Sequence, residues 1–123
     1  ASYWDFAMQE INDWRESDLG GINHAGEMET ALMLHMQEDI VKKEHIIDNP
    51  LKRSTYTGVD LLSGGAVGVS ASFKELSDHG VIGSPSLATK EKGTELFETI
   101  TDKISDFILD FAKWTKPLNG KNE

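Results

Sequence analysis

The chain of 123 residues contains no cysteine, which excludes disulfide bonds and thiolate catalysis. Any protein-bound metal would therefore need His, Asp or Glu ligands. No apolar run approaches the roughly 20 residues that cross a bilayer, and the first residues lack the basic region and apolar stretch of a signal peptide. We therefore expect a cytoplasmic protein with no membrane partner.

Basic residues are also scarce. The chain has 12 Lys and Arg against 21 Asp and Glu, a formal net charge of -9. A surface of this charge repels phosphate backbones and anionic lipids, so we expect no nucleic-acid partner. The length corresponds to one domain with one core.

Two segments indicate β-structure. The opening ASYWDFA, residues 1–7, is rich in aromatic residues and predicts the end of a core strand. Apolar residues alternate with small or polar ones over residues 67–74, which predicts a half-buried strand. The intervening residues 48–65 contain glycines, one proline and no clear period, which indicates a long loop.

Two other segments indicate helices. The residues from 25 to 37 are good helix formers without Gly beyond position 26, and their apolar character predicts a helix packed on more than one side. Apolar residues recur every three or four positions from Leu96 to Trp114, which predicts an amphipathic helix over residues 87–114 with Trp114 in the core. Ser84 or Ser86 is the expected N-cap, and residues 115–123 are expected to form a flexible tail.

The stretch GGINHAGEMETALML, residues 20–34, places ionisable groups at the start of the first of these helices. Glu29 begins an apolar stripe, so we expect its carboxylate to be largely buried and to need a partner, either backbone amides or a chemical role. His24 precedes the helix among glycines that permit close backbone approach to a ligand. Its spacing alone fits a structural histidine as well as a catalytic one.

Three motifs together resemble the C-terminal half of the creatininase family: SYWDF at 2–6, NHAGEMETALML at 23–34 and GVIGSPSLATKEKG at 80–93. The resemblance implies that residues 1–114 form half of a three-layer α/β/α fold with a mainly parallel sheet. It also implies a homo-oligomer, a hexamer in the family. Such enzymes hydrolyse a C–N bond in a cyclic amide or formamide, so a small-molecule amide is the expected substrate.

The same resemblance assigns roles to residues. His24 resembles the histidine that passes a proton from a metal-activated water to the departing nitrogen, and Glu29 resembles the acidic partner that orients it. Trp4 resembles an aromatic residue that closes over the substrate, and Asn23 and Gly26 are expected to lie beside it. Histidine suits proton transfer because it titrates near neutral pH.

The family's cofactor is a divalent metal pair of Zn, Mn or Fe, and its ligand motifs belong to the N-terminal half. None of those motifs occurs in this chain, so no residue here is expected to be a metal ligand. The missing N-terminal half is then a required partner. The alternative is a non-catalytic scaffold or regulatory subunit with the same fold.

Overall fold

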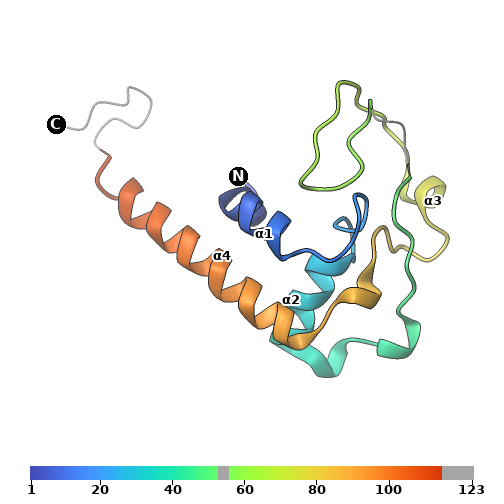
Figure 1. The fold of residues 1–123 in the computed structure, drawn as a ribbon, viewed down its shortest axis with the longest axis horizontal. Helices are drawn as coiled ribbons and strands as arrows, with labels where there is room; N and C mark the ends of the chain where they lie inside the picture. Colours follow the sequence, from blue (N-terminus) through green and yellow to red (C-terminus); the bar gives the residue numbers. More distant parts are fainter. Residues whose placement is uncertain (53–55, 115–123) are drawn as a thin grey trace.

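A computed structural model describes residues 1–52 and 56–114, which form a helical body (Figure 1). The expected tail, residues 115–123, lies outside the described residues, as do three residues of the expected loop. The elements in chain order are η1 (Tyr3–Ala7), α1 (Met8–Trp14), α2 (Glu27–Gln37), η2 (Glu38–Ile40), η3 (Lys43–His45), α3 (Phe73–Leu76), η4 (Pro85–Leu87) and α4 (Lys90–Phe111).

The expected α/β fold with a parallel sheet is wrong for this chain. Residues 1–52 and 56–114 contain no β-strand; their only β-type pairings are two isolated bridges, Asn49 with Gly83 and Thr57 with Val67. A strand persists only when a neighbouring strand takes up its backbone hydrogen bonds. The extended segments of this chain do not find such a neighbour, so they remain loops.

The two predicted strands fail for local reasons. Residues 3–7 form the 3₁₀ helix η1, and Ser2 N–H donates to Asp5 Oδ2 at 2.7 Å in a capping box at its start. Ser72 likewise begins the short helix α3, with its N–H 2.8 Å from Glu75 Oε2. A Ser followed three residues later by an acidic side chain starts a helix, and here this preference overrides the alternating pattern.

Both predicted helices are confirmed. The first is α2, and the second is α4, which begins three residues later than predicted and ends before Trp114. Its N-cap is Thr89, whose Oγ1 accepts the Lys92 N–H at 3.1 Å. The prediction of Ser84 or Ser86 as its cap is wrong, because Ser84 instead precedes the separate 3₁₀ helix η4.

The core lies where α2 crosses α4. A Cβ added to Gly93 of α4 would come within 3.0 Å of the Ala31 carbonyl oxygen of α2, closer than real Cβ atoms approach. Gly93 therefore lets the two helix backbones touch. Apolar residues from both helices and from α1 and the loops fill the surrounding space, namely Ala7, Ile11, Ile22, Met28, Leu32, Leu62, Leu96 and Ile100.

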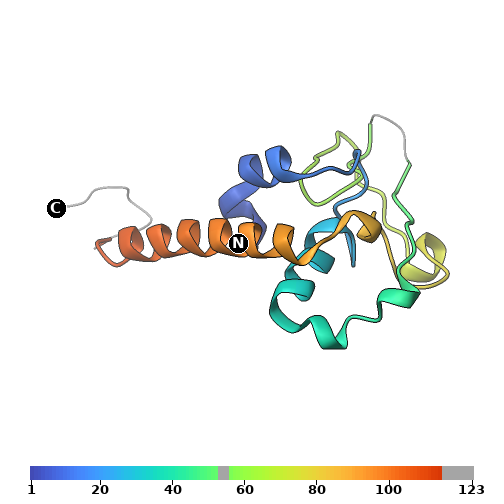
Figure 2. The same ribbon diagram turned by 60° about the horizontal axis from the view of Figure 1, so that its bottom comes forward.

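The C-terminal half of α4 extends beyond this body (Figure 2). Trp114, expected in the core, is 38% exposed, and its ring packs on Phe107 and Phe111 of the same chain end. The predicted amphipathic period is present, but within the described residues Phe107, Ile108, Leu109 and Phe111 of the final turns stay exposed, and of these Phe107 packs on Phe6 of η1. No helix in the described part of the chain has the length and apolar character needed to cross a membrane.

Candidate active site

His24 lies on a tight loop between α1 and α2, and backbone hydrogen bonds from distant segments hold this loop. The His24 carbonyl accepts the Ile82 N–H at 2.8 Å, and the Ile22 carbonyl accepts the Leu61 N–H at 2.9 Å. Gly21 O accepts two N–H groups, from Glu27 at 3.1 Å and from Ser84 at 2.9 Å. The loop is therefore fixed by chain segments on both sides of it.

The backbone beside His24 has an unusual conformation. Ala25 has φ 51°, the only positive φ of a non-glycine residue in residues 1–52 and 56–114. This left-handed conformation costs about 1–2 kcal/mol for a residue with a Cβ. Such conformations cluster at functional sites, where the surrounding structure holds them in place.

Glu29 stabilises that conformation. Its Oε2 accepts the Ala25 N–H at 2.6 Å, a short charge-assisted hydrogen bond. Glu29 is partly buried, so it meets the expectation of a largely buried side chain only in part. The partner that the sequence led us to expect for this carboxylate is a backbone amide. The amide belongs to Ala25, the residue after His24, and the hydrogen bond does not involve the His24 imidazole.

An apolar cavity of about 640 Å³ opens beside His24 and Glu29. Most of its lining residues belong to α2 and α4, including Met33 and Met36 of α2 and Phe97 and Ile104 of α4. The His24 ring is exposed at this rim, where it packs edge-on against Phe73 with ring centroids 4.9 Å apart. The imidazole thus faces a cavity instead of open solvent alone.

Tyr3 adds a phenol to the same cavity. Burial, and after it the neighbouring Glu29 carboxylate, raises the pKa of Tyr3 to about 12. The phenol therefore stays protonated at neutral pH and can donate a hydrogen bond. Sequence reasoning missed this residue, although it lies directly before Trp4 in SYWDF.

The structure places the other expected site residues as follows. Trp4 is half-buried against the core and packs edge-on against Tyr3, outside the lining of the cavity. Asn23 uses its side chain within the loop, since Oδ1 accepts the His24 N–H at 2.9 Å. Gly26 is the N-cap of α2, and a Cβ there would strike the Gly21 carbonyl oxygen. Their substrate contacts stay predictions.

Glu27 is the fully buried carboxylate of this region, two residues from the one that sequence reasoning selected. Its oxygens accept the Glu16 N–H at 3.0 Å and the Ser17 N–H at 2.9 Å, and Oε1 pairs with Lys92 Nζ. Burial raises the pKa of Glu27, but the hydrogen bonds from Lys92, Ser17 and Glu16 outweigh it and hold the pKa below its usual value. The ion pair ties the start of α2 to the first turn of α4.

Lys92 also fixes the position of Trp14. The ammonium lies 4.6 Å from the centroid of the Trp14 ring, and Trp14 Nε1–H donates to the Lys92 carbonyl at 3.1 Å. Cation–π contact and hydrogen bond together account for this side chain structurally.

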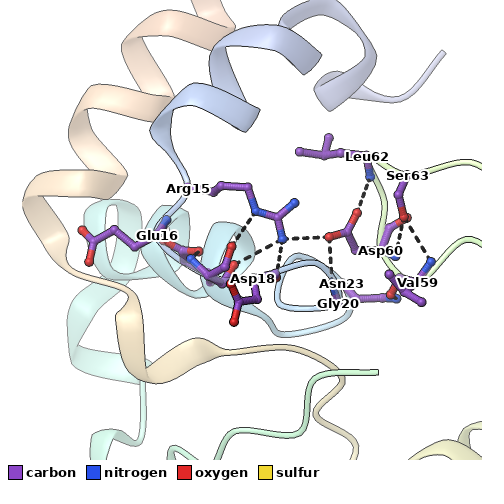
Figure 3. Close-up of polar contacts among 11 residues, drawn as sticks. Arg15, Glu16, Asp18, Gly20, Asn23, Val59, Asp60, Leu62 and Ser63 are labelled. Carbon is purple, nitrogen blue, oxygen red and sulfur yellow. Dashed lines mark hydrogen bonds and ion pairs between the residues drawn. The ribbon is translucent and has the colours of Figure 1, made fainter. Parts of the chain in front are cut away.

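A second buried ion pair joins Arg15 to Asp60 (Figure 3). Arg15 Nη2 lies 2.8 Å from Asp60 Oδ2, and the two side chains are 9% and 0% exposed. Asp60 also accepts the Gly20 N–H at 3.0 Å and the Leu62 N–H at 3.2 Å. The pair was missed because its partners are 45 positions apart, and no period or motif links them.

Comparison with known proteins identifies the family. The family described as "Creatininase: Creatinine amidohydrolase" matches residues 1–108. The chain belongs to the creatininase family.

Two curated members show how much of the family domain this chain represents. It is 30% identical to the creatinine amidohydrolase of Pseudomonas putida over 113 residues, which cover 87% of this chain and 39% of that protein. It is 29% identical to the mycofactocin precursor peptide peptidase of Mycobacterium ulcerans (strain Agy99) over 101 residues, or 82% of this chain and 36% of that protein. The chain thus spans well under half the length of these relatives, and no solved structure matches it significantly.

The metal pair associated with the creatininase family does not fit the residues present here. The described residues contain no group of three or more His, Asp or Glu side chains that could hold a metal ion. His35 Nδ1 instead contacts Thr94 Oγ1 at 2.9 Å, and His45 and His79 are exposed. Within the described residues, this creatininase-family chain presents a histidine at a cavity without a metal site of its own.

Proposed function

We propose that this chain supplies the proton-transfer half of an active site that hydrolyses a C–N bond in an amide. The observation that carries the proposal is the position of His24 at the rim of an apolar cavity, on a loop whose backbone is held in a costly conformation. A surface histidine without a role would not require the left-handed Ala25 beside it. Membership of the creatininase family supports the same reaction class.

His24 is the group that moves the proton. An amide nitrogen is a poor leaving group until it is protonated, and imidazole can accept and return a proton near neutral pH. The exposed ring keeps its nitrogens free for this exchange, because within the described residues none of its ring atoms is hydrogen-bonded, and Phe73 restricts its tilt. The apolar walls of the cavity exclude water around the bond to be cleaved, which strengthens each polar interaction there.

Glu29 acts through the backbone. By accepting the Ala25 N–H it fixes the peptide that follows His24, and so it sets the direction of the imidazole. Tyr3, which stays protonated, is placed to donate to the substrate carbonyl or to Glu29. We assign substrate contacts to Trp4, Asn23 and Gly26 on family resemblance, with Asn23 and Gly26 shaping the loop.

The remaining parts of the site lie outside this chain. The divalent metal pair of Zn, Mn or Fe would need ligands from the rest of the family domain, since the described residues offer no such cluster. The same polypeptide is the natural cover for the apolar cavity between α2 and α4, and a homo-oligomer completes the assembly. The substrate is a cyclic amide or formamide, with short peptides as a further amide class because one relative is a peptidase.

Substitution of His24 tests this proposal. In the complete protein loaded with Mn, Zn or Fe, a panel of cyclic amides, formamides and short peptides is screened for hydrolysis. We expect His24→Ala to lower kcat by about 100-fold or more, the usual contribution of a proton-transfer group, with bound metal and melting temperature unchanged. His45→Ala is the matched control, since His45 is an exposed histidine, as His24 is, but lies outside the cavity lining. Activity surviving His24→Ala would remove the proton-transfer role.

The second candidate is a non-catalytic scaffold or regulatory subunit. The observation in its favour is that the described residues hold no metal cluster. It predicts that the complete protein binds no metal pair and that His24→Ala changes neither hydrolysis nor ligand binding. Metal analysis of the purified protein separates the two candidates before any substrate is known.

A further inference from the structure

We propose that Asp60, together with Arg15, is the positioning device for the His24 loop. The inference rests on the proposed function and extends it to two residues that lie outside the cavity lining. Asp60 lies in the long segment between η3 and α3, and Arg15 directly follows α1. Their side chains meet beside Gly20, where the chain enters the His24 loop (Figure 3).

The Asp60 carboxylate organises three chain segments at once. Oδ2 accepts from Arg15 Nη2 at 2.8 Å and from Gly20 N–H at 3.0 Å, while Oδ1 accepts the Leu62 N–H at 3.2 Å. Ser63 Oγ accepts the N–H groups of Val59 and Asp60 at 3.1 Å each, which fixes the turn that presents the carboxylate. Asp60 is thus held on its own loop and reaches across to the start of the His24 loop.

Arg15 holds the other side of the same junction. Its Nε donates to the Ser17 carbonyl at 2.9 Å, and its Nη2 donates to the Asp18 carbonyl at 2.6 Å as well as to Asp60. The guanidinium therefore sets the turn that leads from α1 into Gly20. Its Nη1 is buried and has no hydrogen-bond partner among the described residues.

The two neighbours of Asp60, Val59 and Leu61, form hydrogen bonds with the His24 loop. Leu61 N–H donates to the Ile22 carbonyl at 2.9 Å, and Asn23 Nδ2 donates to the Val59 carbonyl at 3.4 Å. Asn23 in turn accepts the His24 N–H at 2.9 Å. A continuous chain of hydrogen bonds therefore runs from the Asp60 segment to the backbone of His24.

A buried ion pair is a costly way to join two loops. Pairs of this kind are often no more stabilising than apolar residues of equal volume, whereas their directional hydrogen bonds fix geometry. Proton transfer is sensitive to such geometry, because a displacement of about 1 Å can lower a rate about 100-fold. We therefore assign Asp60 and Arg15 a role in placing the imidazole, which they do not touch.

The test compares Asp60→Asn with Arg15→Met/Asp60→Leu in the complete metal-loaded protein. Asp60→Asn leaves the Arg15 charge buried and uncompensated. The double variant removes both charges together with the carboxylate oxygens that accept the Gly20 and Leu62 N–H groups. We expect kcat to fall about 10- to 100-fold in both variants, with KM within about threefold, because the loop shifts in each case. We expect the melting temperature to recover in part only in the double variant. Leu96→Ala is the control for loss of stability alone, since Leu96 is a buried core residue that neither lines the cavity nor contacts this turn through a hydrogen bond.

Amide hydrogen exchange gives a readout that needs no substrate. Exchange at Leu61 and Ile82, whose N–H groups donate to Ile22 and His24, should accelerate at least tenfold in Asp60→Asn while the amides of α4 keep their protection. Unchanged exchange, or a fall in kcat that Leu96→Ala reproduces at equal loss of stability, would overturn the proposal. If neither the unaltered protein nor any variant hydrolyses an amide, the proposed reaction is wrong. The rates of amide hydrogen exchange then test the positioning role by themselves.

Discussion

Replacing Gly93 with alanine tests the helix crossing on which the whole body depends. In an isolated helix this change would stabilise by about 1 kcal/mol, since alanine is the better helix former. In this chain the new Cβ would lie within 3.0 Å of the Ala31 carbonyl oxygen, a backbone atom that cannot rotate away. The two helices must therefore move apart, and this movement would displace the first turn of α2, where the candidate site begins.

The two effects oppose each other, and packing should dominate. Overfilling a close-packed contact costs about 1–3 kcal/mol, and loss of core contacts along α2 and α4 adds to it. We expect a net loss of about 1–2 kcal/mol after the gain in helix propensity is subtracted. Urea unfolding followed by circular dichroism measures it, with Glu98→Ala as a control on an exposed position of the same helix. A Gly93→Ala protein as stable as the parent, or more stable, would refute the close crossing.

Two further predictions concern the start of α2. Ala25→Gly should change the free energy of unfolding by less than about 1 kcal/mol, because relief of the left-handed strain offsets the entropy that glycine adds to the unfolded chain. Ala25→Val should destabilise the protein by about 2 kcal/mol or more. Urea unfolding of both variants measures these changes, and an Ala25→Val protein as stable as the parent would contradict the positive φ of Ala25. Glu27→Gln should cost about 2–4 kcal/mol at pH 7, since the exposed Glu16 is then the carboxylate that still pairs with Lys92, beside the contact of its ammonium with the Trp14 ring. Because the pKa of Glu27 is lowered in the folded state, its contribution is complete above the unfolded-state pKa of 4.5 and is lost as pH falls through the folded-state pKa. The difference in stability between parent and variant should therefore stay constant near pH 7 and shrink as pH falls below 4.5. A difference that does not depend on pH in that range would count against the buried carboxylate.

Helices with a strong period were predictable from the sequence. The apolar spacing from Leu96 onward places one face of α4 against α2 whatever the rest of the chain does, and the structure agrees. The predicted helix is too long at its C-terminal end, because the apolar spacing continues to Trp114 whereas α4 ends at Phe111 and Trp114 stays partly exposed. A periodic pattern specifies a face, but burial requires a second surface.

The predicted strand over residues 67–74 failed because alternation is weak when half of the residues are small. Gly68, Ser70 and Ser72 add little β-propensity, and a strand also needs a partner that the described chain does not provide. The capping signal from Ser72 to Glu75 was present in the sequence and predicts the short helix that the structure contains.

The polar part of the site was predictable only in outline. The position of His24 before α2 follows from the motif, but the choice between Glu27 and Glu29 as the buried carboxylate depends on Lys92, which lies 65 positions away. Asp60 likewise acquires its role from Arg15 and Gly20. Contacts of this separation arise from the tertiary fold, and no local spacing encodes them.

The carbonyl of Gly21 sets an order of events for the folding chain. It accepts N–H groups from Glu27 nearby and from Ser84, more than sixty positions later, and added side chains at Gly26 or Gly83 would collide with it. Contacts between residues so far apart form late, because the chain must first lose the entropy of closing the intervening loop. The histidine-bearing turn is therefore incomplete in a nascent chain that ends before residue 84, and such a chain also lacks all of α4, against which α2 packs.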